Sequence, residues 1–393
     1  MNSADFTQPS GTLVSETWGE QTYLAFVPNP LPPEVGYDRA LAYALAEASH
    51  KLGELSSLGR WVANPHLLIN PFTREEAVLS SRIEGTQTDL LGLYAYEAGQ
   101  LSQLDPRETP LSRNDARNDA REVHNYVQAL NYGLEAMKKK PLTLNMLREM
   151  HRILLDGVRG GQAAPGEFRR IQNYIGGEVT GLLEARYVPP PTRELMPALD
   201  AFERYIHASS EEPALVRLAW LHYQFEAIHP FIDGNGRIGR LIITLLLIEW
   251  NLLPAPLLYL SAYIEKHRGA YYDLLLDVSR RSSWREWTLF FLQGIAIQAD
   301  AAVNAARRLL DLQANWRGQV AQFGNSKTPS QVVDMLFESP IINAKLIVER
   351  FNVSQPTAST IINRLKAIGI LIDYTPNTRS GWYVAAEVLP KDV

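Results

Sequence analysis

The chain has 393 residues, 46% of them hydrophobic, which is too long for one compact core and predicts two or three domains. Its formal net charge of −5 argues against a chain-wide attraction to nucleic acid or to membranes. Cysteine is absent, which excludes disulfides, thiolate nucleophiles and cysteine-ligated zinc and fits a reducing cytoplasm.

The first segment, residues 1–38, is rich in proline, glycine and threonine and predicts an extended lead-in. It lacks the basic and apolar parts of a secretory signal. The most lipid-like run, residues 241–248, is far shorter than the ~20 residues of a membrane-spanning helix. We therefore expect a cytoplasmic protein without a membrane partner.

Helical patterning follows over residues 39–58 and from Thr73 to Gly85, where Thr73 and Glu76 have the spacing of a capping box. A polar-faced helix is expected over 112–137, and its repeat RNDARNDAR (113–121) indicates a solvated surface. A further amphipathic helix is expected to end at Gly157.

The texture changes over residues 160–191, where glycine, proline and short β-prone runs predict a small hairpin, a candidate flap among helices. Helical patterning resumes in five segments. They are 193–208, 214–228, 236–252, 263–280 and 284–323.

The C-terminal part, from Lys327, predicts helices over 329–338, 343–351 and 355–368, followed by two strands around a polar turn. This order resembles a winged helix. This part has seven lysines and arginines and six acidic residues, a nearly neutral balance. Arg364, Lys366 and Arg379 could form a small basic patch. DNA contact and a protein-contact or dimerisation role are both left open.

The stretch HPFIDGNGRIGR, residues 229–240, carries the chemistry. His229 ends a helix before Pro230, Asn235 is placed to cap the next helix, and Gly236 allows a ligand to approach the backbone. Exposed amides at a helix start bind anions. The loop therefore has the parts of a phosphate-binding site.

Arg237 and Arg240 sharpen this interpretation, because cations in the first turn oppose the helix dipole and need an anion nearby. A polyphosphate would provide it, and Asp233 could hold the Mg²⁺ that accompanies ATP. His229 suits a general base that takes a proton from an attacking hydroxyl.

Two other interpretations compete. The loop could be only a tight turn with a core histidine and solvated arginines. Alternatively, His222, Glu226 and His229 share one helix face and could bind zinc. Neither explains an anion site flanked by two arginines, which favours the nucleotide site.

These residues match the Fic family motif HPFxDGNGRxxR at every fixed position, and the chain resembles a Fic protein adenylyltransferase. The matching residues are His229, Pro230, Phe231, Asp233, Gly234, Asn235, Gly236, Arg237 and Arg240. The resemblance implies a mainly all-α fold with a β-hairpin flap. It also implies transfer of AMP from ATP, with Mg²⁺, to a Tyr, Thr or Ser hydroxyl of a target protein.

The resemblance also implies roles for the motif residues. His229 is the base and Asp233 the Mg²⁺ ligand. Asn235 and the amides of Gly234 and Gly236 hold the α-phosphate, while Arg237 and Arg240 hold the β- and γ-phosphates.

A second motif of the family, S/T-x-x-x-E-G/N, matches Ser80, Glu84 and Gly85. A carboxylate in the last turn of a helix is disfavoured by the dipole, so Glu84 calls for a cation. The resemblance implies that Glu84 contacts Arg240 and blocks the γ-phosphate position. Some members with this glutamate remove AMP, so the reverse reaction stays open.

The remaining parts resemble the family more loosely. The candidate flap resembles the element that pairs with a target strand, and residues 260–275 resemble the helix that closes over adenine, with Tyr271 or Tyr272 beside the ring. The expected division is an N-terminal region over 1–111, a Fic core over 112–300, a linker over 301–326 and a winged helix over 327–393. Self-modification, a homodimer and a nucleotide-responsive DNA-binding regulator also remain open.

Overall fold

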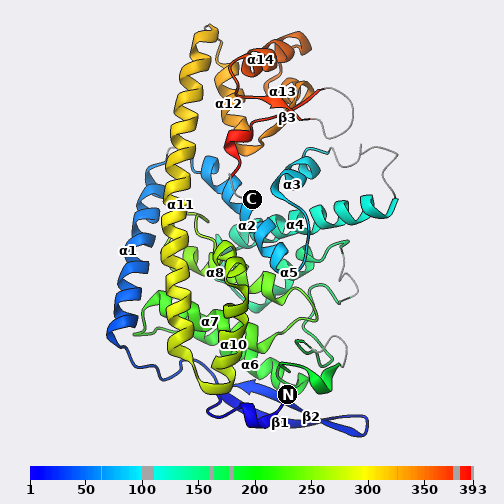
Figure 1. Ribbon diagram of the computed structural model, residues 1–393, viewed down its shortest axis with the longest axis vertical. Helices are drawn as coiled ribbons and strands as arrows, with labels where there is room; N and C mark the ends of the chain where they lie inside the picture. Colours follow the sequence, from blue (N-terminus) through cyan, green and yellow to red (C-terminus); the bar gives the residue numbers. More distant parts are fainter. Residues whose placement is uncertain are drawn as a thin grey trace. The chain divides into compact units, whose positions relative to one another are not determined.

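The computed structural model describes residues 1–62, 64–99, 110–158, 163–176, 181–324, 326–374 and 381–390. The fold is mainly helical with small sheets, as expected (Figure 1). The helices of the described chain are α1 Arg39–Trp61, α2 His66–Ile83, α3 Leu90–Glu97, α4 Pro110–Met137, α5 Leu144–Leu154, α6 Thr192–His207, α7 Ala214–Ile228, α8 Asn235–Glu249, α9 Ser261–Lys266, α10 Arg268–Arg281, α11 Trp284–Val320, α12 Thr328–Glu338, α13 Ala344–Phe351 and α14 Gln355–Ala367. The strands are β1 Gly11–Trp18, β2 Gln21–Pro28, β3 Ile341–Asn343, β4 Ile372–Asp373 and β5 Trp382–Val384.

Contacts within the chain define two compact units. The first comprises residues 1–57 and 125–300, and the second comprises residues 58–124 and 301–393. Helices α1, α4 and α11 contribute residues to both. The domain limits expected from the sequence remain predictions.

The core of the first unit is built on α7, which packs against α6, α8 and α10. Nearly every side chain of α7 is buried, because this helix is apolar on almost all faces. Indole groups bond α7 to α11: Trp220 of α7 donates to Thr288 at 3.1 Å, and Trp287 of α11 donates to the Ala219 carbonyl at 2.8 Å. This packing fixes the end of α7, where the candidate site begins.

The N-terminal segment differs from the expected lead-in. Residues 11–28 form an antiparallel hairpin, with Gly11 opposite Pro28 and Trp18 opposite Gln21, and Gly19 turns it with a φ of +61°. Its β-branched and aromatic residues favour strands more than its glycine and threonine content suggested. The amide of Phe26 donates to the Val188 carbonyl at 2.9 Å, so β2 is hydrogen-bonded to the segment that precedes α6.

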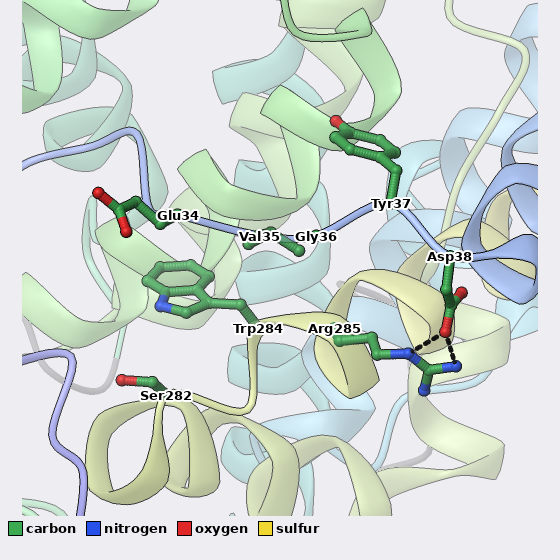
Figure 2. A pocket seen from close by; sticks show the side chains of 8 residues that line it. All are labelled: Glu34, Val35, Gly36, Tyr37, Asp38, Ser282, Trp284 and Arg285. Atoms are coloured by element: carbon green, nitrogen blue, oxygen red, sulfur yellow. Dashed lines mark hydrogen bonds and ion pairs between the residues drawn. The ribbon is translucent and has the colours of Figure 1, made fainter.

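The linker after the hairpin is fixed to the first turn of α11. Asp38 caps α1 by accepting the Leu41 amide at 2.9 Å, and it accepts Arg285 Nε at 2.6 Å (Figure 2). The hydrogen bond from the Leu41 amide, and then that from the Arg285 guanidinium, lower the pKa of Asp38. Trp284 lies beside the linker in the same cavity of about 420 Å³. These contacts hold an irregular segment in place.

In the second unit, α2 packs against α3 and α12. The C-terminal helices α12 to α14 accompany a three-stranded antiparallel sheet of order β3-β5-β4, in which Ile341 and Ile372 both face Val384. The expected three helices and two strands are present, and β3 was not foreseen. The winged-helix assignment stays a prediction, and the expected turn over 375–380 lies outside the described residues.

Three local expectations were wrong. Helix α2 begins at His66, where Asn64 Oδ1 accepts the His66 amide at 3.2 Å, so the buried Thr73 and Glu76 lie inside the helix and form no cap. The expected helix over 263–280 is two helices, α9 and α10, which meet at His267. The repeat over 113–121 is not fully solvated, because Asp119 is buried and accepts the Gln87 amide at 2.9 Å. In the last case a tertiary contact overrides the local pattern.

Helix α11 and the turn after it, Trp284–Phe323, are long and apolar enough to cross a bilayer by length and composition, and 44% of the apolar window is buried. Among the described residues this stretch alone passes this test, and residues 241–248, expected to be the most lipid-like run, do not. A core helix passes the same test, and here Asp300 of α11 pairs with Lys51 of α1 at 2.7 Å. Length and composition therefore assign no membrane role.

Candidate functional site

The candidate site is the loop between α7 and α8. Helix α7 ends at His229, whose left-handed backbone (φ 49°, ψ 61°) turns the chain sharply and leaves the side chain half-buried. Gly234, with a φ of +79°, precedes the first residue of α8. A left-handed non-glycine residue costs about 1 kcal/mol, so the surroundings must hold His229 in place.

Asn235 closes the loop rather than capping α8. Its side chain accepts the Phe231 amide at 2.8 Å and donates to the Phe231 carbonyl at 2.9 Å. The expected N-cap role is therefore wrong, because Asn235 is already the first helical residue and its amide group is directed at the loop. Both bonds are buried, so the loop conformation is firmly fixed.

His151 of α5 supports the loop from outside the motif. Its Nε2–H donates to the Asp233 carbonyl at 3.0 Å, its Nδ1 accepts the Gly166 amide at 2.9 Å, and its ring stacks on Phe231 with centroids 3.9 Å apart. This pattern requires the neutral imidazole, and burial lowers the pKa of His151 to about 4. Sequence reasoning missed His151, because it lies on another helix with no motif of its own.

The start of α8 concentrates positive charge. The first amides of a helix have no acceptor within it. Arg237 and Arg240, in the same turn, are 2% and 3% exposed. Asp233 is exposed, accepts the Gly234 amide at 2.6 Å and lies 3.6 Å from Arg237. The helix dipole and two guanidinium groups together favour an anion at this end of α8.

Comparison with known proteins agrees with this geometry. Residues 42–135 match the model of the Fic/DOC family N-terminal region, and residues 141–247 match the model of the Fic/DOC family. The chain belongs to the Fic/DOC family.

Two relatives illustrate the sequence match. The chain is 34% identical to Protein adenylyltransferase Fic of Drosophila persimilis over 145 residues, which are 35% of this chain and 24% of that protein. It is 37% identical to the protein of the same name in Culex quinquefasciatus over 142 residues, 34% of this chain and 24% of that protein. The chain thus spans about a quarter of the length of these curated relatives.

Solved structures share the fold. A Fic family protein from Desulfovibrio desulfuricans G20 aligns with a TM-score of 0.57 at 21% identity, over 90% of this chain and 98% of that one. A Fic domain containing signaling protein from Bacteroides thetaiotaomicron VPI-5482 aligns with a TM-score of 0.52 at 18% identity, over 67% of this chain and 97% of that one.

The interpretation of His222, Glu226 and His229 as a zinc site is wrong. Nε2 of His222 is hydrogen-bonded to the Tyr271 hydroxyl at 2.9 Å, and the described residues contain no group of three side chains placed to hold a metal. Burial, and then the charge of Arg240, lowers the pKa of His222 to about 3. His222 is therefore a neutral core residue that supports the Fic domain.

The two candidate adenine neighbours differ in exposure. Tyr271 is 1% exposed and bonded to His222, whereas Tyr272 is half-buried, with its ring centroid 5.2 Å from that of Tyr271. Only the Tyr272 ring is accessible to a ligand in this arrangement.

The candidate flap contains a single antiparallel bridge among its described residues. Ile175 and Tyr187 exchange two backbone hydrogen bonds, at 2.8 and 3.1 Å, and the Tyr187 hydroxyl donates to the Ala227 carbonyl of α7 at 2.8 Å. Tyr174 and Ile175 are exposed. The expected hairpin is thus present in reduced form, and parts of the expected segment, residues 160–162 and 177–180, lie outside the described chain.

Two residues of the flap segment contact the loop between α7 and α8, residues 229–234, which we call the Fic loop. These contacts were not predicted from the sequence. Arg169 and Asn173 donate to main-chain carbonyls of residues 228–231. Main-chain acceptors leave no trace in the sequence, so no pattern could have revealed these contacts.

The motif of Ser80, Glu84 and Gly85, expected to be inhibitory, lies at the end of α2 in the second unit. Ser80 is fully buried, Glu84 is exposed at the C-terminal cap, and Gly85 follows with a φ of +99°. The expected helix end is confirmed, because a glycine in the left-handed region ends a helix without strain.

The basic side chains expected on the C-terminal module are engaged locally. Arg364 donates to the Phe323 carbonyl at 2.9 Å, and Lys366 pairs with Asp373 at 2.7 Å. Arg379 lies outside the described residues. DNA contact through these residues stays a prediction.

Proposed function

We propose that this chain is a protein adenylyltransferase that transfers AMP from ATP to a Tyr, Thr or Ser hydroxyl of a target protein. One observation carries the proposal: the loop from His229 to Arg240 places a histidine, a helix N-terminus and two buried arginines together. The names of the matched relatives support it. The chain itself could be one of the targets.

The chemistry follows from the arrangement. Nδ1 of His229 lies 3.3 Å from the Glu226 carbonyl, which favours a proton on Nδ1 and a lone pair on Nε2. Nε2 accepts the proton of the target hydroxyl as its oxygen attacks the α-phosphorus. The bond from that phosphorus to the bridging oxygen breaks, and pyrophosphate leaves. The helix amides, Arg237 and Arg240 stabilise the charge on the phosphates.

Asp233 fits a Mg²⁺ ligand. Its recorded contacts involve only Oδ1, and its side chain is half exposed. The described residues provide no cluster of three acidic or histidine side chains, so the ion would take most ligands from phosphate oxygens and water, as Mg²⁺ prefers. Bound there, Mg²⁺ would neutralise charge on the leaving pyrophosphate.

We further propose that Glu84 holds the enzyme off by contacting Arg240. The support is the spacing of Ser80, Glu84 and Gly85 and the position of Glu84 at the C-terminal end of α2, where a carboxylate needs a cation. Removal of AMP from a modified protein is the alternative role for Glu84.

The test measures transfer of label from α-³²P-ATP with Mg²⁺ to proteins of a cell lysate. We expect weak labelling by the wild type, at least about tenfold stronger labelling by Glu84→Gly, and none by Glu84→Gly with His229→Ala, since removing a general base costs about 10²- to 10⁴-fold. Glu47→Gly, the same change at an exposed residue of α1, should label like the wild type.

Different outcomes contradict different parts of the proposal. If neither the wild type nor Glu84→Gly labels protein although both bind ATP, the transferase assignment is wrong. If both label equally, transfer stands and inhibition by Glu84 does not. Mass spectrometry of the labelled protein identifies the modified hydroxyl, and release of AMP from it by the wild type would favour the reverse reaction.

A further inference from the structure

Arg169 is a buried cation whose recorded partners are all main-chain carbonyls. It is 3% exposed. Its guanidinium donates to the carbonyls of His229 at 3.0 Å, of Ile228 and Ile171 at 3.4 Å, and of Pro190. Its own amide donates to the Pro230 carbonyl at 2.9 Å.

Such an arrangement is costly unless it serves a purpose. Burial of a guanidinium is unfavourable, and it lowers the pKa of Arg169 to about 10. No carboxylate is among its recorded hydrogen-bond or ion-pair partners. An apolar side chain of similar volume often stabilises a core better than a buried charge. The geometry therefore indicates that the role of Arg169 is to position the main-chain carbonyls that it binds.

The carbonyls that Arg169 joins belong to two different parts of the site. Ile228 and His229 end α7 and open the Fic loop, whereas Ile171 and Pro190 flank the bridged flap segment. Asn173 of the same segment reinforces the connection by donating to the His229 carbonyl at 3.3 Å and to the Phe231 carbonyl at 2.8 Å. One side chain thus ties the base of the flap to the backbone of the catalytic histidine.

We propose that Arg169 is a positioning residue for transfer, which holds His229 in its left-handed conformation and keeps it in register with the flap; this rests on the proposed function. A helix end is the part of a helix most prone to fray, and here its carbonyls cannot be satisfied within the helix. Arg169 supplies their donors. A displacement of the base by about 1 Å can reduce a reaction rate by about 10²-fold.

The test uses the full chain with Glu84→Gly as the active reference. In that background, Arg169→Met keeps the apolar length and removes the donors, while Arg169→Lys keeps the charge and part of the donors. Arg217→Met is the matched control, because Arg217 also donates to carbonyls at a helix end, those of Tyr205 and Ala208, in the same unit. It lies about 18 Å along α7 from His229, at 1.5 Å per residue.

We expect Arg169→Met to lower the maximal rate of lysate labelling about 10²-fold, with the KM for ATP changed less than about threefold. Arg169→Lys should recover part of that rate, and Arg217→Met should keep the reference rate even where it lowers the melting temperature. A Kd for a non-hydrolysable ATP analogue near that of the reference shows that the Arg169 variants are folded.

The inference is overturned if Arg169→Met binds the analogue normally and labels at the reference rate. It is also overturned if Arg169→Met and Arg217→Met reduce ATP-analogue binding and the labelling rate to the same extent. Arg169 would then have only a structural role. An inactive Glu84→Gly reference would instead contradict the proposed function and is distinguished before any Arg169 variant is measured.

Discussion

His151 shows how one residue outside a motif determines the geometry inside it. It accepts the Gly166 amide through Nδ1 and donates to the Asp233 carbonyl through Nε2, so only one neutral tautomer satisfies both partners. Its ring also stacks on Phe231. The orientation of Asp233 and of the turn at Gly234 therefore depends on a side chain of α5.

Replacing His151 with phenylalanine should keep the stacking and remove both hydrogen bonds. The buried Gly166 amide and the part-buried Asp233 carbonyl would lose their partner, and a buried group left unpaired costs about 1–3 kcal/mol, so the free energy of unfolding in urea should fall by about 2 kcal/mol. The labelling rate should fall about tenfold or more as Asp233 shifts.

His207→Phe is the control for that variant. His207 donates to the Leu142 carbonyl at 2.8 Å and contacts no residue of the loop in any recorded interaction. It should lower stability and leave the labelling rate unchanged. Equal loss of labelling in both variants would mean that His151 acts only through global stability.

At the scale of elements, the crossing of α7 and α8 depends on Gly239. A methyl group there would overlap Oε1 of Glu226 and lie 3.3 Å from Cε1 of His222. Helix propensity alone predicts that Gly239→Ala stabilises α8 by up to about 1 kcal/mol. Overpacking at a helix crossing costs about 1–3 kcal/mol and outweighs that gain.

We therefore expect Gly239→Ala to lower the melting temperature by several degrees and to weaken ATP-analogue binding, because α8 carries Arg237 and Arg240. Gly53→Ala in α1 is the matched control: Gly53 is exposed, and a methyl group there meets no atom within 4 Å. That variant should be stabilised by about 0.5–1 kcal/mol. A stabilised Gly239→Ala would show that the crossing tolerates the extra volume.

Long apolar helices were predictable from the sequence. The expected helix over 214–228 coincides with α7, whose residues are mostly apolar and buried along its whole length. The hairpin over 11–28 was not predicted, because glycine and proline around it masked its alternation. The start of α2 was misplaced, since Pro71 lies inside the helix and the actual first turn at His66 depends on Asn64.

At the scale of the whole molecule, the candidate site was predictable only where it is contiguous in the chain. His229 to Arg240 could be read as an anion site because helix ends and charges obey local rules. His151 and Arg169 could not, since they lie 82 and 60 residues from the atoms that they hold. Their partners are backbone groups, which every sequence contains.

Acid should destabilise the molecule through its buried neutral histidines. The pKa of His151 is lowered to about 4 and that of His222 to about 3, whereas an unfolded histidine titrates near 6.5. Between pH 6.5 and 4 the unfolded chain therefore binds more protons than the folded chain. The free energy of unfolding is highest above pH 6.5 and falls by about 1.4 kcal/mol per pH unit for each histidine as the pH decreases.

The contribution of His151 can be isolated by comparing unfolding in urea at pH 7 and pH 5. Moving from pH 7 to pH 5 should cost the wild type about 2 kcal/mol more than it costs His151→Phe, because the variant has lost one titrating group and retains His222. Every other ionisable group acts in both proteins and cancels in the difference. Equal losses would mean that His151 is not held neutral in the fold, and the hydrogen bonds that orient the loop would then need the protonated ring, which cannot accept the Gly166 amide.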